Sequence, residues 1–519
     1  MKKYIKLTSV IVLAFLMHSC NEDKILDLEP VNNISNDASY SSPSLIQLSV
    51  TGMYNAAQIG QFNSTAPNGG RGYVWGAAFV QQGDNRGEDV VNMAGFYQFT
   101  YQSTYDPNTA NNVYYWVDGY RLINRCNLVI EGVTNAISSG IVTQSVGNDY
   151  IGQAKFLRAI THFELLNFFS RPYNFTTGAT HPGIPYREVG IDTQAEVDAE
   201  IVKGRNTVAE CYTKVIADLD DAEGKITQTA NKSLATKNAA IAFKTRVYLH
   251  QRNWDKVITE GTKSMPGIAL TASPEMPFVT ANNLSNSESI FSIRHAAISG
   301  QNPGVNAALA SQYKTRRLVC ISPIIWRDPS WLVDDKRRAE GSMVETVSGI
   351  KYTNKYKDGV TYTDAAPIIR YAEVVLNMAE AQARKATPNL AAALTLLNSV
   401  RNRALANPVT QAYTSVTLAT QSDMVGAILK ERRIEFLMEG RRWSDIQRLQ
   451  NDNLFPIDGI PAKVGNASAT AAMYVPTTPF TGPYGESAIP SSNFRVLWPL
   501  PLIETNNNPT LAAQQNPGW

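Results

Sequence analysis

The sequence predicts a mostly α-helical fold, in which paired helices form a scaffold and long irregular segments with a few short strands lie outside it. Two observations predict the helices. Apolar residues recur at three- and four-residue steps across residues 149–170, and residues 237–264 and 371–404 each have the pattern of a helical hairpin. A third observation predicts the irregular part, because residues 265–367 are rich in Pro, Asn and Ser and contain only short strand-like runs.

Both predicted hairpins have two short arms with small residues where the helices would cross. The first hairpin breaks at residues 251–253 and the second at residues 387–389. Such a unit resembles a tetratricopeptide repeat, whose helix pairs stack side by side and bury a continuous core. The expected fold is therefore a tetratricopeptide-like scaffold.

Further helices are expected at residues 45–58, 114–132 and 207–223. The helix over 149–170 should end near Arg171, because a residue that precedes proline avoids the α region. Residues 63–89 are rich in Gly, Asn and Gln with embedded aromatic residues, and this composition predicts a loop. The tail from Asn451 has a similar loop-like composition.

The N-terminus has the pattern of a targeting segment. Three lysines precede the apolar residues 7–17, which are long enough for a signal peptide and too short to cross a bilayer. The junction Ser19-Cys20 resembles a bacterial lipobox, so we expect cleavage before Cys20 and acylation of that residue, for example by palmitate. Two or more acyl chains give stable anchoring. The alternative is an ordinary signal peptide with an incidental cysteine.

These features predict the organisation of the chain: a signal peptide at residues 1–19, a lipidated tether at 20–43 and one globular unit at 44–519. That unit has two halves, 44–230 and 231–519, and the second half contains the irregular insertion 265–367. The acidic Asn21-Glu22-Asp23 resembles the export tag of lipoproteins that face the cell exterior. No later stretch reaches about 18 apolar residues, so the lipid is the expected membrane contact.

Charge and motifs argue against several classes of protein. The net charge is +2 over 519 residues, which gives no strong field for nucleic acid and suits a neutral ligand such as a sugar or a mixed peptide. Cys126, Cys211 and Cys320 are widely spaced and are expected to be small buried residues. The sequence contains no HExxH, G-x-S-x-G, P-loop or G-x-G-x-x-G motif, so no catalytic residue, metal or cofactor is expected. A glycoside hydrolase stays the alternative, because 45 acidic residues include possible carboxylate pairs by chance.

A charged run covers residues 431–443. Glu431, Glu435 and Glu439 recur at four-residue spacing, and like charges at that spacing repel unless they are paired. We expect the arginines within the run, at positions 432, 433, 441 and 442, to pair with them in a partly buried structural network, because the guanidinium group binds carboxylates bidentately.

The ligand face is expected where segment 63–89 meets the segment around 313–331. Aromatic rings on loops can stack on the C–H face of a sugar, while a few polar groups bind its hydroxyls. The expected stacking residues are Tyr73, Trp75, Tyr313, Trp326 and Trp331, and the expected hydrogen-bonding residues are Arg71, Asp84, Asn85 and Arg86. Core packing is the alternative for each ring. A calcium loop at residues 84–89 is disfavoured, because Arg86 stands where an oxygen ligand is needed, and a turn whose carboxylates bind sugar hydroxyls or nearby backbone is favoured.

Five stretches in order, behind a lipoprotein signal, resemble the SusD/RagB family of outer-membrane nutrient-binding lipoproteins. They lie at residues 116–133, 153–163, 368–381, 431–448 and 497–518, and include Ile123-Asn124-Arg125, Phe156-Leu157-Arg158-Ala159, Arg370-Tyr371-Ala372-Glu373 and Glu431-Arg432-Arg433. Gln153 stands where the family usually has Glu.

The resemblance implies a tetratricopeptide-like scaffold with an irregular ligand face. It also implies pairing with a SusC-like TonB-dependent outer-membrane barrel, over which the lipoprotein acts as a lid. Relatives bind glycans and some bind peptides. The matched motifs belong to the scaffold, so the resemblance carries over no ligand-binding residue.

Overall fold

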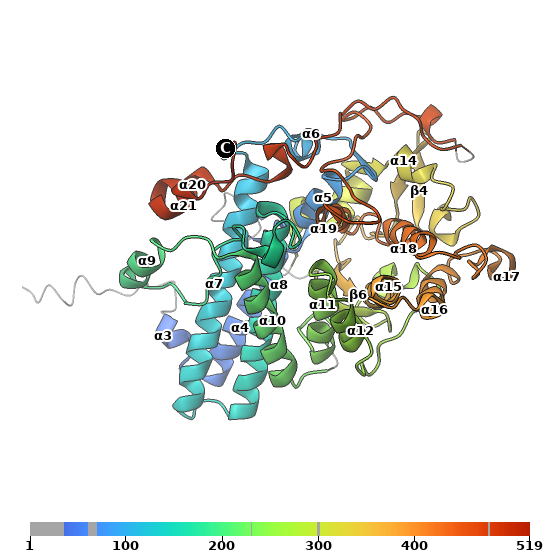
Figure 1. Cartoon of the computed structure of the whole chain (residues 1–519). Helices are drawn as coiled ribbons and strands as arrows, with labels where there is room; N and C mark the ends of the chain where they lie inside the picture. Colours follow the sequence, from blue (N-terminus) through green and yellow to red (C-terminus); the bar gives the residue numbers. More distant parts are fainter. Residues whose placement is uncertain (1–35, 61–69, 230, 298–301, 476–477) are drawn as a thin grey trace, which may run out of the picture.

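The first half of the molecule is a set of long helices packed side by side (Figure 1). The computed structural model describes residues 36–60, 70–229, 231–297, 302–475 and 478–519. Helices α7 (Ala110–Ser138) and α8 (Gln144–Phe169) pack along each other, and α4 (Pro43–Ile59) and α10 (Val208–Lys225) flank this pair. All four helices were predicted, and α8 ends two residues before Arg171, as the following proline indicated.

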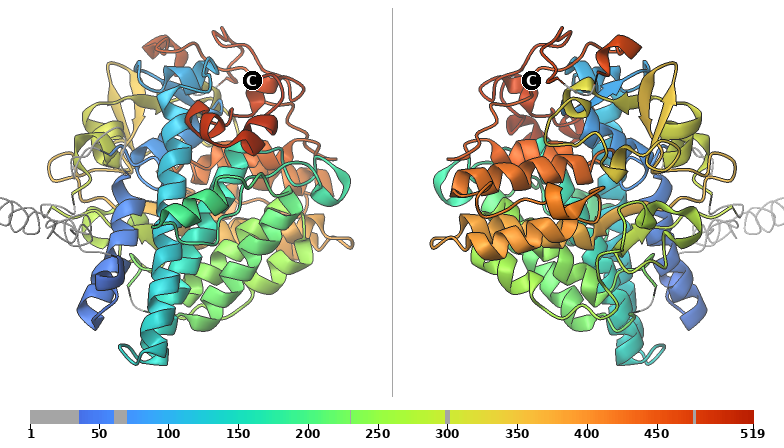
Figure 2. Two further views of the ribbon diagram at one scale, coloured as in Figure 1. Left: turned by 90° about the vertical axis from the view of Figure 1, so that its left-hand side faces the viewer. Right: turned by 90° about the vertical axis from the view of Figure 1, so that its right-hand side faces the viewer.

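The two predicted hairpins are confirmed. Helices α11 (Lys237–His250) and α12 (Trp254–Gly261) form the first pair, and α15 (Tyr371–Arg384) and α16 (Leu390–Arg401) form the second. Helix α12 packs on α15, so the pairs stack, and α18 (Gln421–Glu435) closes the stack against α15 and α16. Figure 2 shows this layer of helices facing the viewer in its right-hand panel. Small buried residues such as Ala239 and Ala242 let neighbouring helices approach closely in this layer.

The remaining chain is irregular with short strands. In the described residues the strands form three antiparallel pairs: β1 (Val90–Asn92) with β3 (Val319–Ile321), β2 (Ser289–Ile293) with β6 (Ala366–Arg370), and β4 (Val344–Val347) with β5 (Ile350–Thr353). Short α-helices accompany them: α3 (Asn36–Ser39), α5 (Ala77–Asn85), α6 (Gln98–Gln102), α9 (Gln194–Glu200), α13 (Gly304–Ala307), α14 (Pro323–Trp326), α17 (Pro408–Gln411), α19 (Arg442–Leu449), α20 (Leu502–Asn507) and α21 (Pro509–Ala513). Single 3-10 or π turns lie at Thr177–Ala179, Met276–Phe278, Thr280–Asn282, Ser311–Thr315, Lys336–Arg338, Ala471–Met473 and Phe494–Val496.

Two predictions of loop are wrong in part. Residues 77–85 form helix α5, all of whose side chains are buried, and the tail contains α20 and α21. The run Ala77-Ala78-Phe79-Val80 has no helix breaker, and burial of the whole element outweighs the weak helix propensity of its neighbours.

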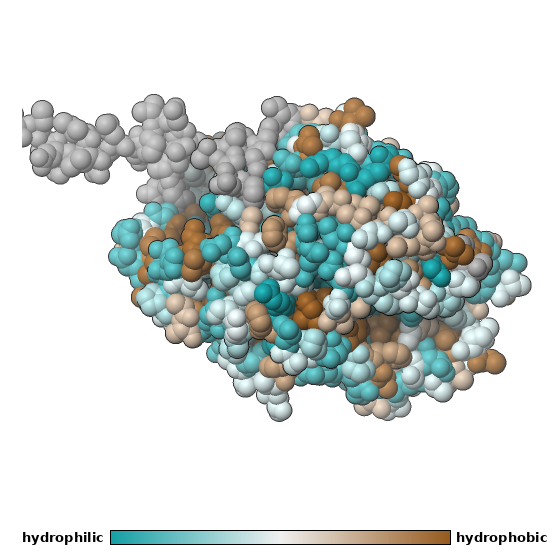
Figure 3. Space-filling view, turned by 90° about the horizontal axis from the view of Figure 1, so that it is seen from above, coloured by the Kyte–Doolittle hydropathy of each residue, from teal (hydrophilic) through white to brown (hydrophobic). Residues whose placement is uncertain are grey.

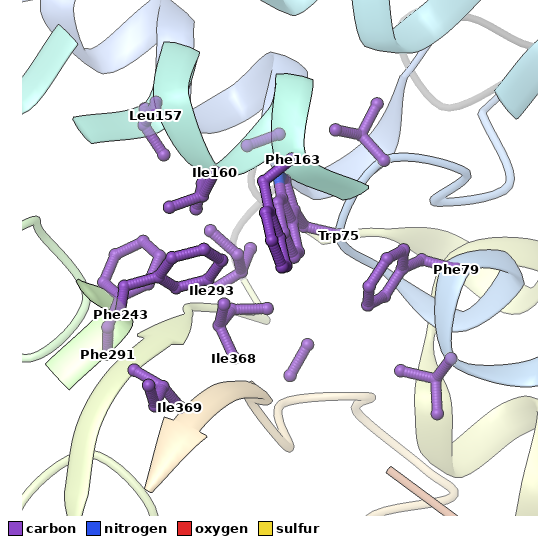
Figure 4. Close-up of a cluster of buried hydrophobic side chains, with 14 of the residues drawn as sticks. Trp75, Phe79, Leu157, Ile160, Phe163, Phe243, Phe291, Ile293, Ile368 and Ile369 are labelled. Atoms are coloured by element: carbon purple, nitrogen blue, oxygen red, sulfur yellow. The ribbon is translucent and has the colours of Figure 1, made fainter. Parts of the chain in front are cut away.

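The centre of the core lies where α8 meets α11 and the β2–β6 pair. Phe163 packs edge-on against Phe243, and Phe156 packs edge-on against Phe291 at 5.1 Å between ring centroids. Figure 4 shows Phe163, Phe243 and Phe291 together with Trp75, which precedes α5, and Phe79, which lies in α5. Each buried ring of this kind contributes about 1.5–3 kcal/mol to folding. The cluster that contains them extends from Tyr40 to Leu511, so both ends of the described chain pack into one core.

A buried charge network holds the end of α18, as predicted, but the predicted partners are wrong. Glu431 pairs with Arg337 and Arg401; Glu435 pairs with Arg337, Arg370 and Arg403; and Glu439 pairs with Arg370 and Lys355. The arginines of the run pair with carboxylates elsewhere: Arg432 with Asp445, Arg433 with Asp89, Arg441 with Glu164 and Arg442 with Glu88. Each carboxylate of the run is therefore paired with cations from outside the run, and spacing within the run did not identify these partners.

Cys126, Cys211 and Cys320 are buried and unpaired, as predicted. Cys20 and the expected signal peptide lie outside the described residues. Within the described ranges, no helix combines the length and the apolar character that a membrane crossing requires.

Candidate functional site

The two segments that were expected to form the ligand face do lie together. Strand β1 pairs with β3, with Val91 opposite Cys320. The Tyr313 hydroxyl donates a hydrogen bond of 3.2 Å to Asp84 Oδ2, which joins the turn at Ser311–Thr315 to α5. The segments therefore meet as predicted, and the candidate site depends on which of their side chains reach the surface.

The expectation that the aromatic rings face solvent is wrong. Tyr73, Trp75, Tyr313, Trp326 and Trp331 are all buried. Trp75 is 0% exposed, and its Nε1 donates to Thr161 Oγ1 at 3.2 Å. The Tyr73 hydroxyl donates to Asn111 Oδ1 at 3.2 Å. Such internal partners satisfy the polar end of a ring, which is how a Tyr or Trp within a polar sequence is accommodated in a core.

The two tryptophans of the second segment enclose a cation. The Arg338 guanidinium lies 4.4 Å from the Trp326 ring centroid and 4.6 Å from that of Trp331. Its Nη2 donates to the backbone carbonyls of both tryptophans. The turn therefore holds the rings inward around Arg338, not outward as expected, because a cation–π pair is stronger away from water.

Arg86, Asp84 and Asn85 are also buried, and Arg86 and Asp84 bind other parts of the framework. The Arg86 guanidinium lies 3.9 Å from the Trp443 ring centroid and donates to the Tyr105 hydroxyl at 3.1 Å. Asp84 accepts a hydrogen bond from the Gly440 backbone at 3.0 Å. Burial raises the pKa of Asp84 to about 8. Asp84 lies in α5 and not in a turn, and its carboxylate binds backbone that is distant in the sequence; none of these three side chains faces solvent.

Arg71 is the member of the predicted set that reaches the surface. It is half-buried, and its guanidinium lies 4.1 Å from the Phe96 ring centroid. Phe99, on α6 just beyond, is 50% exposed. Arg316 is exposed next to the turn that carries Tyr313 and donates to Asn306 Oδ1 at 3.1 Å. We call Arg71, Phe96, Phe99 and Arg316 the Arg71 surface.

Helix α6 lies on the upper side of the molecule in Figure 1. Figure 3 shows the molecule from above, and on this side hydrophobic residues are interspersed with hydrophilic ones. A mixture of apolar and polar groups is the surface character that a sugar, with its C–H faces and hydroxyls, requires of a binding protein.

The charges of both arginines of the Arg71 surface act on one buried phenol, that of Tyr97. Burial raises the pKa of Tyr97 above its usual value, and the positive charges of Arg71 and then Arg316 oppose that increase. The half-buried Tyr114 stacks on the buried Tyr73, with 6.1 Å between the ring centroids. Guanidinium groups beside partly exposed aromatic side chains can bind a sugar: the aromatic ring stacks on the sugar, and the guanidinium donates hydrogen bonds to its hydroxyls.

Sequence reasoning missed Phe96, Phe99 and Arg316. Phe99 carried a usable signal, because it is a large apolar residue in a short segment bounded by the polar residues Gln98 and Gln102. Arg316 carried none, since Arg316 and Arg317 resemble any solvated basic pair. Among the described residues, no group of His, Cys, Asp or Glu side chains is arranged to hold a metal ion.

The fold is that of a helical-repeat protein with irregular segments outside the helix pairs, and the Arg71 surface lies on those segments. Residues 333–519 match the family model described as "SusD family", and residues 26–249 match the one described as "Starch-binding associating with outer membrane". A SusD-like protein of Formosa agariphila is 22% identical over 527 residues, covering 89% of this chain and 95% of that protein. A SusD-like protein of Bacteroides ovatus is 24% identical, covering 85% of this chain and 82% of that protein.

Solved structures have the same fold. The crystal structure of a SusD superfamily protein from Bacteroides fragilis is similar with a TM-score of 0.72 and 25% identity, covering 91% of this chain and 99% of that one. The structure of a SusD superfamily protein from Bacteroides thetaiotaomicron also has a TM-score of 0.72, at 23% identity, and the match covers 92% of this chain and 100% of that one. The chain belongs to the SusD/RagB family.

Proposed function

We propose that this protein is a lipoprotein of the outer membrane that binds a glycan at the cell surface and passes it to a SusC-like TonB-dependent barrel. The observation that carries the proposal is the Arg71 surface, where a guanidinium group stacks on Phe96 next to the exposed ring of Phe99. The family description names starch binding and association with the outer membrane, which supports a glycan as the ligand. Binding without catalysis agrees with the absence of a nucleophile–base motif in the sequence.

We expect the double variant Arg71→Ala/Phe99→Ala to bind its glycan at least about thirtyfold more weakly, because removing an exposed ring and a guanidinium donor from a binding face typically costs about 2 kcal/mol or more. Isothermal titration with a panel of oligosaccharides measures this. Thermal stability should change little, since both side chains are partly exposed.

The matched control is Arg121→Ala/Phe175→Ala, which removes an exposed arginine and an exposed phenylalanine from other parts of the surface. Equal glycan affinity of the two double variants would mean that the Arg71 surface is not the glycan-binding face. Binding of a mixed peptide panel in place of the oligosaccharides would favour the peptide-binding alternative. Release of products from the oligosaccharides would favour the hydrolase alternative.

The anchor is tested separately. We expect Cys20→Ala to move the protein from the membrane fraction to the soluble fraction, because the acyl chains on Cys20 would be its attachment. Cell fractionation in a strain that lacks the barrel partner measures this, since the partner itself would retain the protein. Continued membrane partitioning of the variant in that strain would count against acylation of Cys20.

A further inference from the structure

A cavity of about 640 Å³ lies between α18, α19 and the segments that follow α17 and α19. Figure 1 places α17 and α18 at the right-hand end of the molecule. The walls are largely apolar and include Tyr413, Leu418, Leu449, Phe455 and Ile457. A concave space of this size with apolar walls and a few placed polar groups is the usual form of a small-molecule site.

Two nearly buried arginines form its polar side. The side chains of Arg433 and Arg442 are only 14% and 10% exposed and both line the cavity. Arg433 binds Asp89 through Nε and Nη2, and Arg442 binds Glu88 through Nε and Nη2, at 3.0 and 2.6 Å for the latter pair. These bidentate contacts fix both guanidinium planes and give the arginines a rigid orientation.

The remaining nitrogen of each guanidinium is left for another partner. Nη1 of Arg433 and Nη1 of Arg442 donate no hydrogen bond to any other residue in the described part of the chain, and neither atom is among the fully enclosed unpaired ones. Neither Nη1 atom is fully enclosed, and both side chains line the cavity. A ligand that fills the cavity without an acceptor would leave two donors unpaired, which is costly.

The walls offer ring surfaces for the other face of a ligand. Tyr413 is half-buried, and the Arg401 guanidinium lies 4.3 Å from its ring centroid. Phe455 lies directly against Gly426, where an added Cβ would come within 3.1 Å of its ring. Rings fixed from behind in this way can stack on a sugar without being reorganised.

The charged groups at the cavity leave no surplus of positive charge. The two arginines are paired with Asp89 and Glu88, and Lys430 is paired with Asp328. Two further carboxylates line the cavity: Asp445, which is paired with Arg432 and Arg448, and Asp423, which completes the capping box of α18. An anionic ligand would meet no surplus of positive charge. The hydroxyls of Thr417 and Ser422 at the lining add small neutral donors and acceptors.

We propose that this cavity is a second binding site for a neutral, hydroxyl-rich sugar unit, separate from the Arg71 surface. The inference rests on the proposed glycan-binding function and deepens it. The Nη1 donors of Arg433 and Arg442 would bind hydroxyl oxygens, and Tyr413 and Phe455 would contact the C–H face. Two sites at separate places would let one protein hold two positions of a long glycan, which increases avidity without any new contact.

The test blocks the cavity without touching its charge network. Ser422 is exposed in the first turn of α18 and lines the cavity, so Ser422→Trp places a large side chain across it. Ser138→Trp, at the exposed end of α7, is the matched control. Tyr413→Ala removes one wall, and Tyr484→Ala, at an exposed tyrosine of the tail, is its control. The probes are maltotriose, cellotriose, mannotriose and, as the acidic comparison, trigalacturonate, measured by isothermal titration and saturation-transfer NMR.

At least one neutral trisaccharide should show a binding event in the cavity whose affinity falls by about tenfold or more in Ser422→Trp and in Tyr413→Ala. Both controls and the Arg71→Ala/Phe99→Ala variant should keep the parent affinity for this binding event. The inference is overturned if no neutral probe has a component sensitive to Ser422→Trp, or if trigalacturonate is the probe that depends on this cavity. Loss of all binding in the Arg71→Ala/Phe99→Ala variant would contradict a second binding site but would agree with the proposed function. A parent protein that binds no probe and no panel glycan would remove the proposed function itself.

Discussion

An Arg370→Ala variant is expected to lose about 3–5 kcal/mol of unfolding free energy, because it would leave buried carboxylates without their cation. Arg370 contacts Glu288, Glu435 and Glu439, and all four side chains are buried. Urea denaturation followed by circular dichroism measures the change. Arg121→Ala, at an arginine that is about half exposed, is the control and should cost less than about 1 kcal/mol.

The pH dependence distinguishes this explanation from lost packing. Burial alone would raise the pKa of Glu435, but the charges of Arg403, Arg370 and Arg337 outweigh it and hold the pKa below its ordinary value of 4.5. A depressed folded-state pKa gives stability that is present above 4.5 and is lost as the pH falls below it. The difference between parent and Arg370→Ala should therefore shrink towards low pH. A difference that stays constant from pH 7 to acid would point to packing and contradict the electrostatic account.

The helical scaffold was predictable because its signals are local. The hairpin breaks at 251–253 and 387–389 fall where α11 and α15 have ended and before α12 and α16 begin. Periodicity and turn residues act over a few positions, so they are visible in one sequence. Helix α5 was missed because Gly, Asn and Gln around it have the composition of a loop, and its burial depends on segments far away in the chain.

In the charge network, too, the local sequence predicted that the carboxylates need cations but did not predict which cations they bind. The four-residue spacing of Glu431, Glu435 and Glu439 predicted that they must be neutralised. It contained no information on Arg337 and Arg370, which approach from the irregular insertion and from β6. A spacing rule predicts that a partner exists, whereas the fold decides which residue it is.

The candidate site was the least predictable part. The meeting of the two segments was predicted correctly, and Arg71 is on the surface as expected. The exposure of the aromatic rings was not predictable, because a Trp beside polar residues can equally be a core residue with an internal hydrogen-bond acceptor or a cation against its face. Phe96, Phe99 and Arg316 become candidates only when the surface between α6 and the turn at Ser311–Thr315 is known.

A Trp75→Ala variant is expected to lose about 3–5 kcal/mol of unfolding free energy, since truncation of a fully buried tryptophan leaves a cavity that the core fills only in part. Trp75 packs against Phe79 with ring centroids 4.7 Å apart and binds Thr161, so the loss would loosen α5 from α8. Thermal and urea denaturation measure the change. The control is Trp254→Ala, at a half-buried tryptophan that begins α12, and it should cost clearly less.

The same variant separates a core role for Trp75 from the stacking role that the sequence suggested. Well below its melting temperature, the folded fraction of Trp75→Ala should bind the glycan with an affinity close to that of the parent, because the ring is enclosed and the Arg71 surface lies outside it. Trp75→Phe, which keeps a ring in the core, should recover part of the stability. Unchanged stability of Trp75→Ala together with lost glycan binding would mean that the ring contacts the ligand, and would restore the face expected from the sequence.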